Sequence, residues 1–62
     1  MDSLTAVLIA EGAEAPDSEE QYFEAWQYLV NTGMAWSLQG WFGRTAQVYI
    51  NEGYIKPAGG NG

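Results

Sequence analysis

The segment PDSEEQYFEAWQYLVNTG, residues 16–33, carries the clearest structural signal in the chain. Its large apolar side chains recur at the spacings of one face of an α-helix. They are Tyr22, Phe23, Trp26, Leu29 and Val30. Asp17 and Glu20 have capping-box spacing, and so have Ser18 and Gln21. The pattern predicts a helix that begins within a residue or two of Asp17 or Ser18 and ends between residues 31 and 33.

Glycines mark the ends of the other helical segments. SLTAVLIAE predicts a helix from Ser3 to Glu11, with Asp2 or Ser3 as its N-cap and Gly12 as its stop. The segment MAWSLQG, residues 34–40, is too short to persist as an isolated helix. Tertiary contacts must therefore hold it.

GRTAQVYINEG predicts the last helix of the chain. Gly53 is expected to close it, with Tyr54 or Ile55 folding back onto the final turn. Gly40 is expected to end the short turn before it. Gly43 is expected to let the backbone approach a bulky aromatic side chain closely.

These segments show no internal repeat and no strand-like alternation, and they predict an all-α fold. We expect a small three-helix bundle with a short extra helical turn between helices two and three, occupying residues 1–55, and a flexible C-terminal tail over residues 56–62. The predicted core consists of Leu4, Val7, Leu8, Phe23, Trp26, Leu29, Val30, Leu38, Phe42, Ala46, Tyr49 and Ile50.

Size and composition limit how this fold is stabilised. The chain of 62 residues has room for one domain, and it has no cysteine and no histidine, which excludes disulfides and the usual zinc sites. Packing, alone or with a partner, must supply the stability. No apolar run reaches the roughly 20 residues of a membrane span, and the first residues lack the positive charge of a signal peptide. We expect a soluble cytoplasmic protein with no membrane partner.

The same composition argues against an enzyme or a metal site. Histidine and cysteine are absent, and the serines have capping or surface explanations. Asp17, Glu20 and Glu24 could offer oxygen ligands to a hard cation, but no loop offers the remaining ligands, so a solvated acidic face is the simpler interpretation. We expect no catalytic residue, no metal and no cofactor.

Eight acidic residues against only Arg44 and Lys56 give a net charge of -6. Such a surface repels nucleic-acid phosphates and favours a partner protein with a basic patch. A glycine-rich turn before Arg44 could receive an anion, although pairing of Arg44 with a nearby carboxylate is simpler. One alternative stays open, because GRTAQVYINEGYI has the form of a winged-helix recognition helix in which Arg44, Gln47 and Asn51 would read bases.

The tryptophans suggest how a partner protein would be bound. Three of them are difficult to bury in so small a domain, because each is large and has an N–H that needs an acceptor. Exposed aromatic residues rimmed by acidic ones are typical of protein-binding surfaces. The predicted partner-binding residues are Trp36, Trp41, Arg44, Asp17, Glu20 and Glu24. A homodimer seam in a self-associating accessory protein is the other alternative.

LVNTGMAWSLQGWFGRTAQVYINEGYI, together with SLTAVLIAEG, resembles a group of very short uncharacterised proteins of tailed bacteriophages. That group shares a pattern close to Leu-Val-x-Thr-Gly-x-Ala-Trp-x-Leu-Gln-Gly-x-Phe/Tyr-Gly-Arg-Thr-Ala. The likeness extends from Ser3 to Ile55. It implies a protein made in the cytoplasm of an infected bacterial cell, where small acidic phage proteins bind and modulate host or anti-phage defence proteins.

Overall fold

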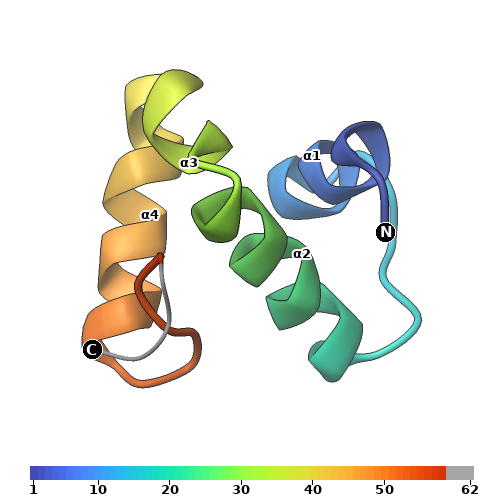
Figure 1. Cartoon of the computed structure of the whole chain (residues 1–62). Coiled ribbons are helices and arrows are strands. Elements are labelled where there is room, and N and C mark those ends of the chain that lie inside the picture. Colours follow the sequence, from blue (N-terminus) through green and yellow to red (C-terminus); the bar gives the residue numbers. More distant parts are fainter. Residues whose placement is uncertain (59–62) are drawn as a thin grey trace.

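Four helices make up the computed structural model, which describes residues 1–58. They are α1 (Ser3–Glu11), α2 (Glu19–Asn31), α3 (Met34–Ser37) and α4 (Gly40–Asn51). No strand occurs within residues 1–58, so the predicted all-α class is confirmed. Helix α2 lies between α1 on one side and α3 and α4 on the other (Figure 1). The radius of gyration, 10.5 Å, matches that of a folded chain of this length.

The ends of α1 and α2 are set by side-chain caps. Asp2 accepts a hydrogen bond of 2.8 Å from the backbone N–H of Thr5 and is the N-cap of α1. Hydrogen bonds from the side chain of Thr5 and, to a smaller extent, from its backbone lower the pKa of the Asp2 carboxyl. Ser18 Oγ accepts a hydrogen bond of 3.0 Å from the N–H of Gln21, which makes Ser18 the N-cap of α2. Of the two capping pairs in the sequence, the second is therefore the one used.

The core forms around α2. Trp26 and Leu29 of this helix are fully buried, and the ring of Trp26 packs against Trp41, Phe42 and Tyr49 of α4. The buried apolar residues are Ala6, Ile9, Ala10, Ala25, Trp26, Leu29, Val30, Ala35, Phe42, Ala46 and Ile55. Five predicted core residues are fully part of it: Trp26, Leu29, Val30, Phe42 and Ala46. Five more pack against it while partly buried: Val7, Phe23, Leu38, Tyr49 and Ile50.

The predicted buried face of α1 is wrong at Leu4, whereas Val7 packs against the core as predicted and Leu8 is half-buried. Leu4 is 68% exposed, whereas Ala6 and Ile9 face the core. Six of the nine residues of α1 are apolar and they lie on all sides of the helix, so its sequence period does not distinguish one face from another. The alanines decide the orientation, because small side chains at a contact let two helices approach more closely.

The prediction that Gly40 ends the short turn is wrong. Gly40 is the first residue of α4, while α3 ends at Ser37. The chain changes direction at Leu38 and Gln39, both of which adopt extended backbone angles. The turn therefore needs no glycine, and α4 begins earlier than the sequence pattern suggests.

The segment after α4 folds back against α2. Gly53 has a φ of 85°, its N–H bonds to the carbonyl of Ile50 at 3.1 Å, and the N–H of Tyr54 bonds to the carbonyl of Tyr49 at 2.9 Å. This is the predicted Schellman closure. Ile55 is buried by it.

Lys56 continues this return to α2. Its backbone N–H donates to Gln27 Oε1 at 2.7 Å, and its carbonyl accepts from Gln27 Nε2 at 2.8 Å. The predicted flexible tail, residues 56–62, thus begins with a residue whose backbone is hydrogen-bonded to α2, and residues 59–62 lie outside the described part of the chain. None of the four helices is long and apolar enough to cross a bilayer.

Candidate functional site

A groove of about 600 Å³ lies between the first turns of α2 and the segment that follows α4. We call it the acidic groove. It is lined by Asp17, Ser18, Glu20, Gln21, Phe23, Glu24, Gln27, Tyr54 and Ile55. The two sides of the groove are far apart in sequence. The closure at Gly53 and the hydrogen bonds between Gln27 and the backbone of Lys56 bring them together.

The aromatic wall of the groove is a stacked pair. The rings of Phe23 and Tyr54 are parallel to within 5°, with centroids 4.7 Å apart. The ring of Tyr49 is nearly perpendicular to both, and its centroid lies 5.1 Å from that of Phe23 and 6.0 Å from that of Tyr54. Tyr54 nevertheless remains 57% exposed. The groove thus presents an aromatic surface that neighbouring rings hold in place.

The other wall is negatively charged. Asp17, Glu20 and Glu24 are all exposed and line the groove, and no basic residue lines it. Glu20 and Glu24 lie four residues apart and so share one side of α2. Lys56 is held nearby through its backbone but is not a lining residue. Three predicted site residues are therefore brought to one place.

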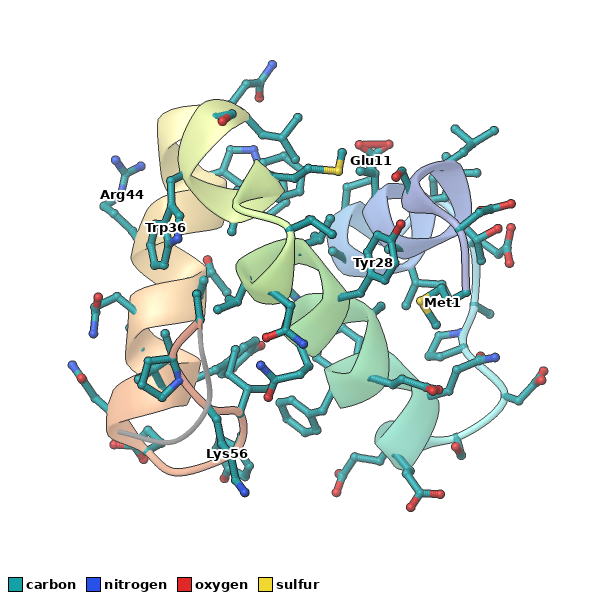
Figure 2. The ribbon with its side chains drawn as sticks, viewed as in Figure 1. Met1, Glu11, Tyr28, Trp36, Arg44 and Lys56 are labelled. Atoms are coloured by element: carbon teal, nitrogen blue, oxygen red, sulfur yellow. The ribbon has the colours of Figure 1, made fainter. Side chains whose placement is uncertain are left out.

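Two more predicted site residues, Trp36 and Arg44, lie on the α3 and α4 side of the molecule (Figure 2). Trp36 is 49% exposed. Its ring rests over Gly43, where a Cβ atom would come within 3.2 Å of Trp36 Cε3. This confirms the prediction that Gly43 allows close approach to a bulky aromatic side chain. We call Trp36, Gly43 and Arg44 the tryptophan face.

Arg44 is not paired as the sequence suggested. Within residues 1–58, no carboxylate lies in salt-bridge distance of its guanidinium. Its side chain is exposed on the outer side of α4 (Figure 2). A Cβ added at Gly40 would lie 3.2 Å from an Arg44 guanidinium nitrogen, so this side chain runs back along the first turn of α4.

Trp41, the last predicted site residue, is held by packing. Its ring stacks on Phe42 with centroids 3.9 Å apart and meets Trp26 edge-on at 6.3 Å. Its indole N–H donates to Gln39 Oε1 at 3.1 Å. Packing therefore explains the placement of Trp41, and a role in partner binding stays a prediction.

The tryptophan face and the acidic groove do not form one surface. The groove carboxylates flank the start of α2, whereas α3 follows its end (Figure 1). Helix α2 has 13 residues. At 1.5 Å per residue this separates its ends by roughly 20 Å. None of Trp36, Gly43 and Arg44 lines the groove.

Two polar features of the aromatic core are unusual. Trp26 Nε1 is buried with no hydrogen-bond partner among residues 1–58, and the ring that carries it contacts the rings of Trp41, Phe42 and Tyr49. Aromatic ring faces are weak acceptors for such an N–H. The hydroxyls of Tyr22 and Tyr49 are 2.9 Å apart. The pKa of Tyr49 is raised to about 12, mainly by this hydrogen bond and secondly by burial.

Sequence reasoning missed Tyr54 and Gln27 as site residues. Tyr54 was expected only to close the last helix, yet it forms the aromatic wall of the groove. The signal that could have found it is the Gly53–Tyr54 pair, since a Schellman turn directs the following side chain back across its own helix. Gln27 offered no comparable signal. Within residues 1–58, no group of three or more acidic side chains is placed to hold a metal ion.

The chain is thus a small all-helical domain that carries an acidic groove and an exposed tryptophan on its surface. Its residues 1–61 match a family described as a domain of unknown function, DUF7417, and the chain belongs to that family. No curated protein and no solved structure matches it.

Proposed function

We propose that this chain is a small acidic protein-binding module. The observation that carries the proposal is the contrast between two tryptophans. Trp26 is fully buried, whereas Trp36 leaves 49% of its surface exposed. Tryptophan is enriched among the residues that dominate protein–protein binding energies. Trp36 is a preformed anchor of this kind, because Gly43 supports its ring from below.

The proposed partner is a bacterial host protein or an anti-phage defence protein, whose activity the module changes on binding. What supports this part is the resemblance of residues 3–55 to short proteins of tailed bacteriophages. The net charge of -6 supports a partner with a basic surface, because charge complementarity speeds association and helps to exclude wrong partners. The module would then act in the cytoplasm of the infected cell, without catalysis and without a cofactor.

The proposal is tested by affinity capture from bacterial lysate followed by mass spectrometry. The unmodified chain should retain a specific protein, and Trp36→Ala should lose most of it. Leu4→Ala is the matched control, because Leu4 is also an exposed apolar residue but lies on α1. Equal capture by Trp36→Ala and the unmodified chain would contradict the assignment of Trp36, and no specific capture at all would count against the function.

Duplex DNA binding is a second candidate, favoured by one observation. Arg44, Gln47 and Asn51 are all exposed at helical spacing on α4. However, Gln47 Nε2 donates to Asn51 Oδ1 at 3.0 Å, so these amides already bond to each other. The negative net charge also opposes phosphate contacts. Binding of labelled duplex at low salt that is lost with Arg44→Ala would favour this candidate over the first.

Self-association is the third candidate, with the exposed aromatics as the seam. Light scattering over a concentration series tests it directly. A monomer at every concentration would remove it. A dimer that Trp36→Ala dissociates would instead assign the tryptophan face to a second copy of the chain.

A further inference from the structure

We propose that the acidic groove binds an arginine side chain presented by a basic segment of the partner protein. This inference rests on the proposed function, because it names the chemistry of one contact that a protein-binding module would make. It concerns a different surface from the tryptophan face, so the two assignments can fail separately.

The lining of the groove is complementary in charge to a cation. Asp17, Glu20 and Glu24 line the groove, and none of its lining residues is basic. Within residues 1–58, no salt bridge occupies these carboxylates. An arriving cation would therefore find acceptors that no side chain of the chain's own neutralises. An anionic occupant, including a nucleic-acid backbone, would be repelled.

The aromatic wall offers a second contact to a cation. Tyr54 is stacked on Phe23 and still 57% exposed. A cation beside an aromatic ring is attracted by the negative charge of the ring face. A groove with carboxylates on one side and an exposed tyrosine on the other thus offers two kinds of contact to the same side chain.

These two contacts together favour arginine over lysine. The guanidinium group is planar, so it stacks on an aromatic ring and bonds to carboxylates in a fork geometry at the same time. A lysine ammonium is a compact, strongly hydrated charge that does not stack. The volume of about 600 Å³ is large enough for an extended side chain together with part of its backbone.

The groove is also held in shape before any ligand arrives. Two hydrogen bonds join Gln27 to the backbone of Lys56, and Ile55 is buried beside them. The closure at Gly53 fixes the start of the same segment. Little ordering is needed on binding, and this lowers the entropic cost of association.

The test uses a labelled peptide of alternating arginine and glycine, with a second peptide in which lysine replaces every arginine. Binding to the full chain is followed by fluorescence anisotropy at low and at physiological salt. The arginine peptide should bind about fivefold more tightly than the lysine peptide, because stacking adds to the charge attraction. Equal affinity for the two peptides would show general charge attraction only and would overturn the proposal.

Two double variants with the same change in net charge locate the site. Glu20→Gln with Glu24→Gln removes two groove charges and should weaken the arginine peptide about tenfold. Glu11→Gln with Glu14→Gln removes two exposed charges outside the groove and should change affinity by no more than about twofold. Equal losses in the two variants would overturn the proposal.

Tyr54→Leu tests the aromatic wall separately. It should weaken the arginine peptide several-fold and the lysine peptide much less, with circular dichroism checking that the fold is kept. Should this variant fail to fold, the two charge variants still decide the question. If the unmodified chain does not bind the arginine peptide while its Trp36-dependent capture of a lysate protein is intact, the groove assignment is rejected and the proposed function stands.

Discussion

The acidic groove and the tryptophan face are built in opposite ways. The tryptophan face joins residues that are close in sequence, because Trp36 needs only Gly43 beneath it, one short turn away. The groove joins the start of α2 to Tyr54 and Ile55, which lie about thirty residues further along the chain. The first surface should therefore survive local changes elsewhere, whereas the second depends on the closure after α4. Substitutions at four positions test this difference.

The largest effect is expected at Trp26, which is the largest fully buried side chain. Trp26→Ala removes contacts to Trp41, Phe42 and Tyr49 and should cost about 3 to 5 kcal/mol. A domain of this size has a total stability of roughly 3 to 9 kcal/mol, so the variant should be largely unfolded and lose both surfaces together. Urea denaturation followed by circular dichroism measures the cost.

Trp26→Phe is the informative companion. It keeps a ring in the core and removes the indole N–H that has no partner. Its cost should be well below that of Trp26→Ala, because one unsatisfied buried donor disappears with the lost volume. A cost equal to that of the alanine variant would mean that the N–H is satisfied after all.

The next largest effect should separate the two surfaces. Gly53 has a φ of 85° and open space around it, so Gly53→Ala should cost about 1 to 2 kcal/mol through backbone strain alone. Gly12→Ala is a matched control, because Gly12 has a φ of 87° and equally open surroundings. Both variants should lose similar stability in urea. Only Gly53→Ala should weaken the arginine peptide, and a similar weakening in both would contradict the dependence of the groove on this closure.

A smaller effect is expected at Gly43. Alanine there gains up to about 1 kcal/mol in helix propensity, but its Cβ would meet the ring of Trp36, so the net change in stability should stay below about 1 kcal/mol. The indole N–H signal of Trp36 in an NMR spectrum should nevertheless shift. In Gly40→Ala, where the new Cβ meets only the end of the Arg44 side chain, that signal should stay in place.

The smallest effect concerns pH. The hydrogen bond to Tyr22 and burial raise the pKa of Tyr49 to about 12, so the folded state holds this proton more tightly than the unfolded state. The resulting stability is fully present below the unfolded pKa of about 10 and is lost as pH rises through the folded value. Tyr22→Phe should lower the pKa of Tyr49, as followed by tyrosinate absorbance. Tyr28→Phe should leave it unchanged, because the Tyr28 hydroxyl lies 3.1 Å from Ser3 Oγ instead.

Local signals in the sequence predicted the helices and most of their ends. Asp2, Ser18 and the glycines at 12 and 53 act through hydrogen bonds within a few residues of themselves, so their roles can be read from neighbouring positions. The face of α1 could not be predicted, because a helix apolar on all sides is oriented only by what it packs against.

The candidate site was predicted in part for the same reason. The acidic residues of α2 follow from local pattern, and the size of the domain indicates that not every tryptophan is buried, but it does not indicate which one is exposed. The aromatic wall does not follow from local pattern, because Tyr54 meets Phe23 only through the tertiary return of the chain. Gly40 was misplaced because Leu38 and Gln39 make the turn in extended conformations that need no glycine.

The independence of the two surfaces is tested most directly by an NMR titration of the full chain with the arginine–glycine peptide. The backbone signals of Gln27, Tyr54 and Ile55 should move together as the groove fills. The indole N–H signal of Trp36 should stay in place. Movement of the Trp36 signal with the same midpoint, or no movement at the three groove residues, would contradict the assignment of the groove as a separate arginine-binding surface.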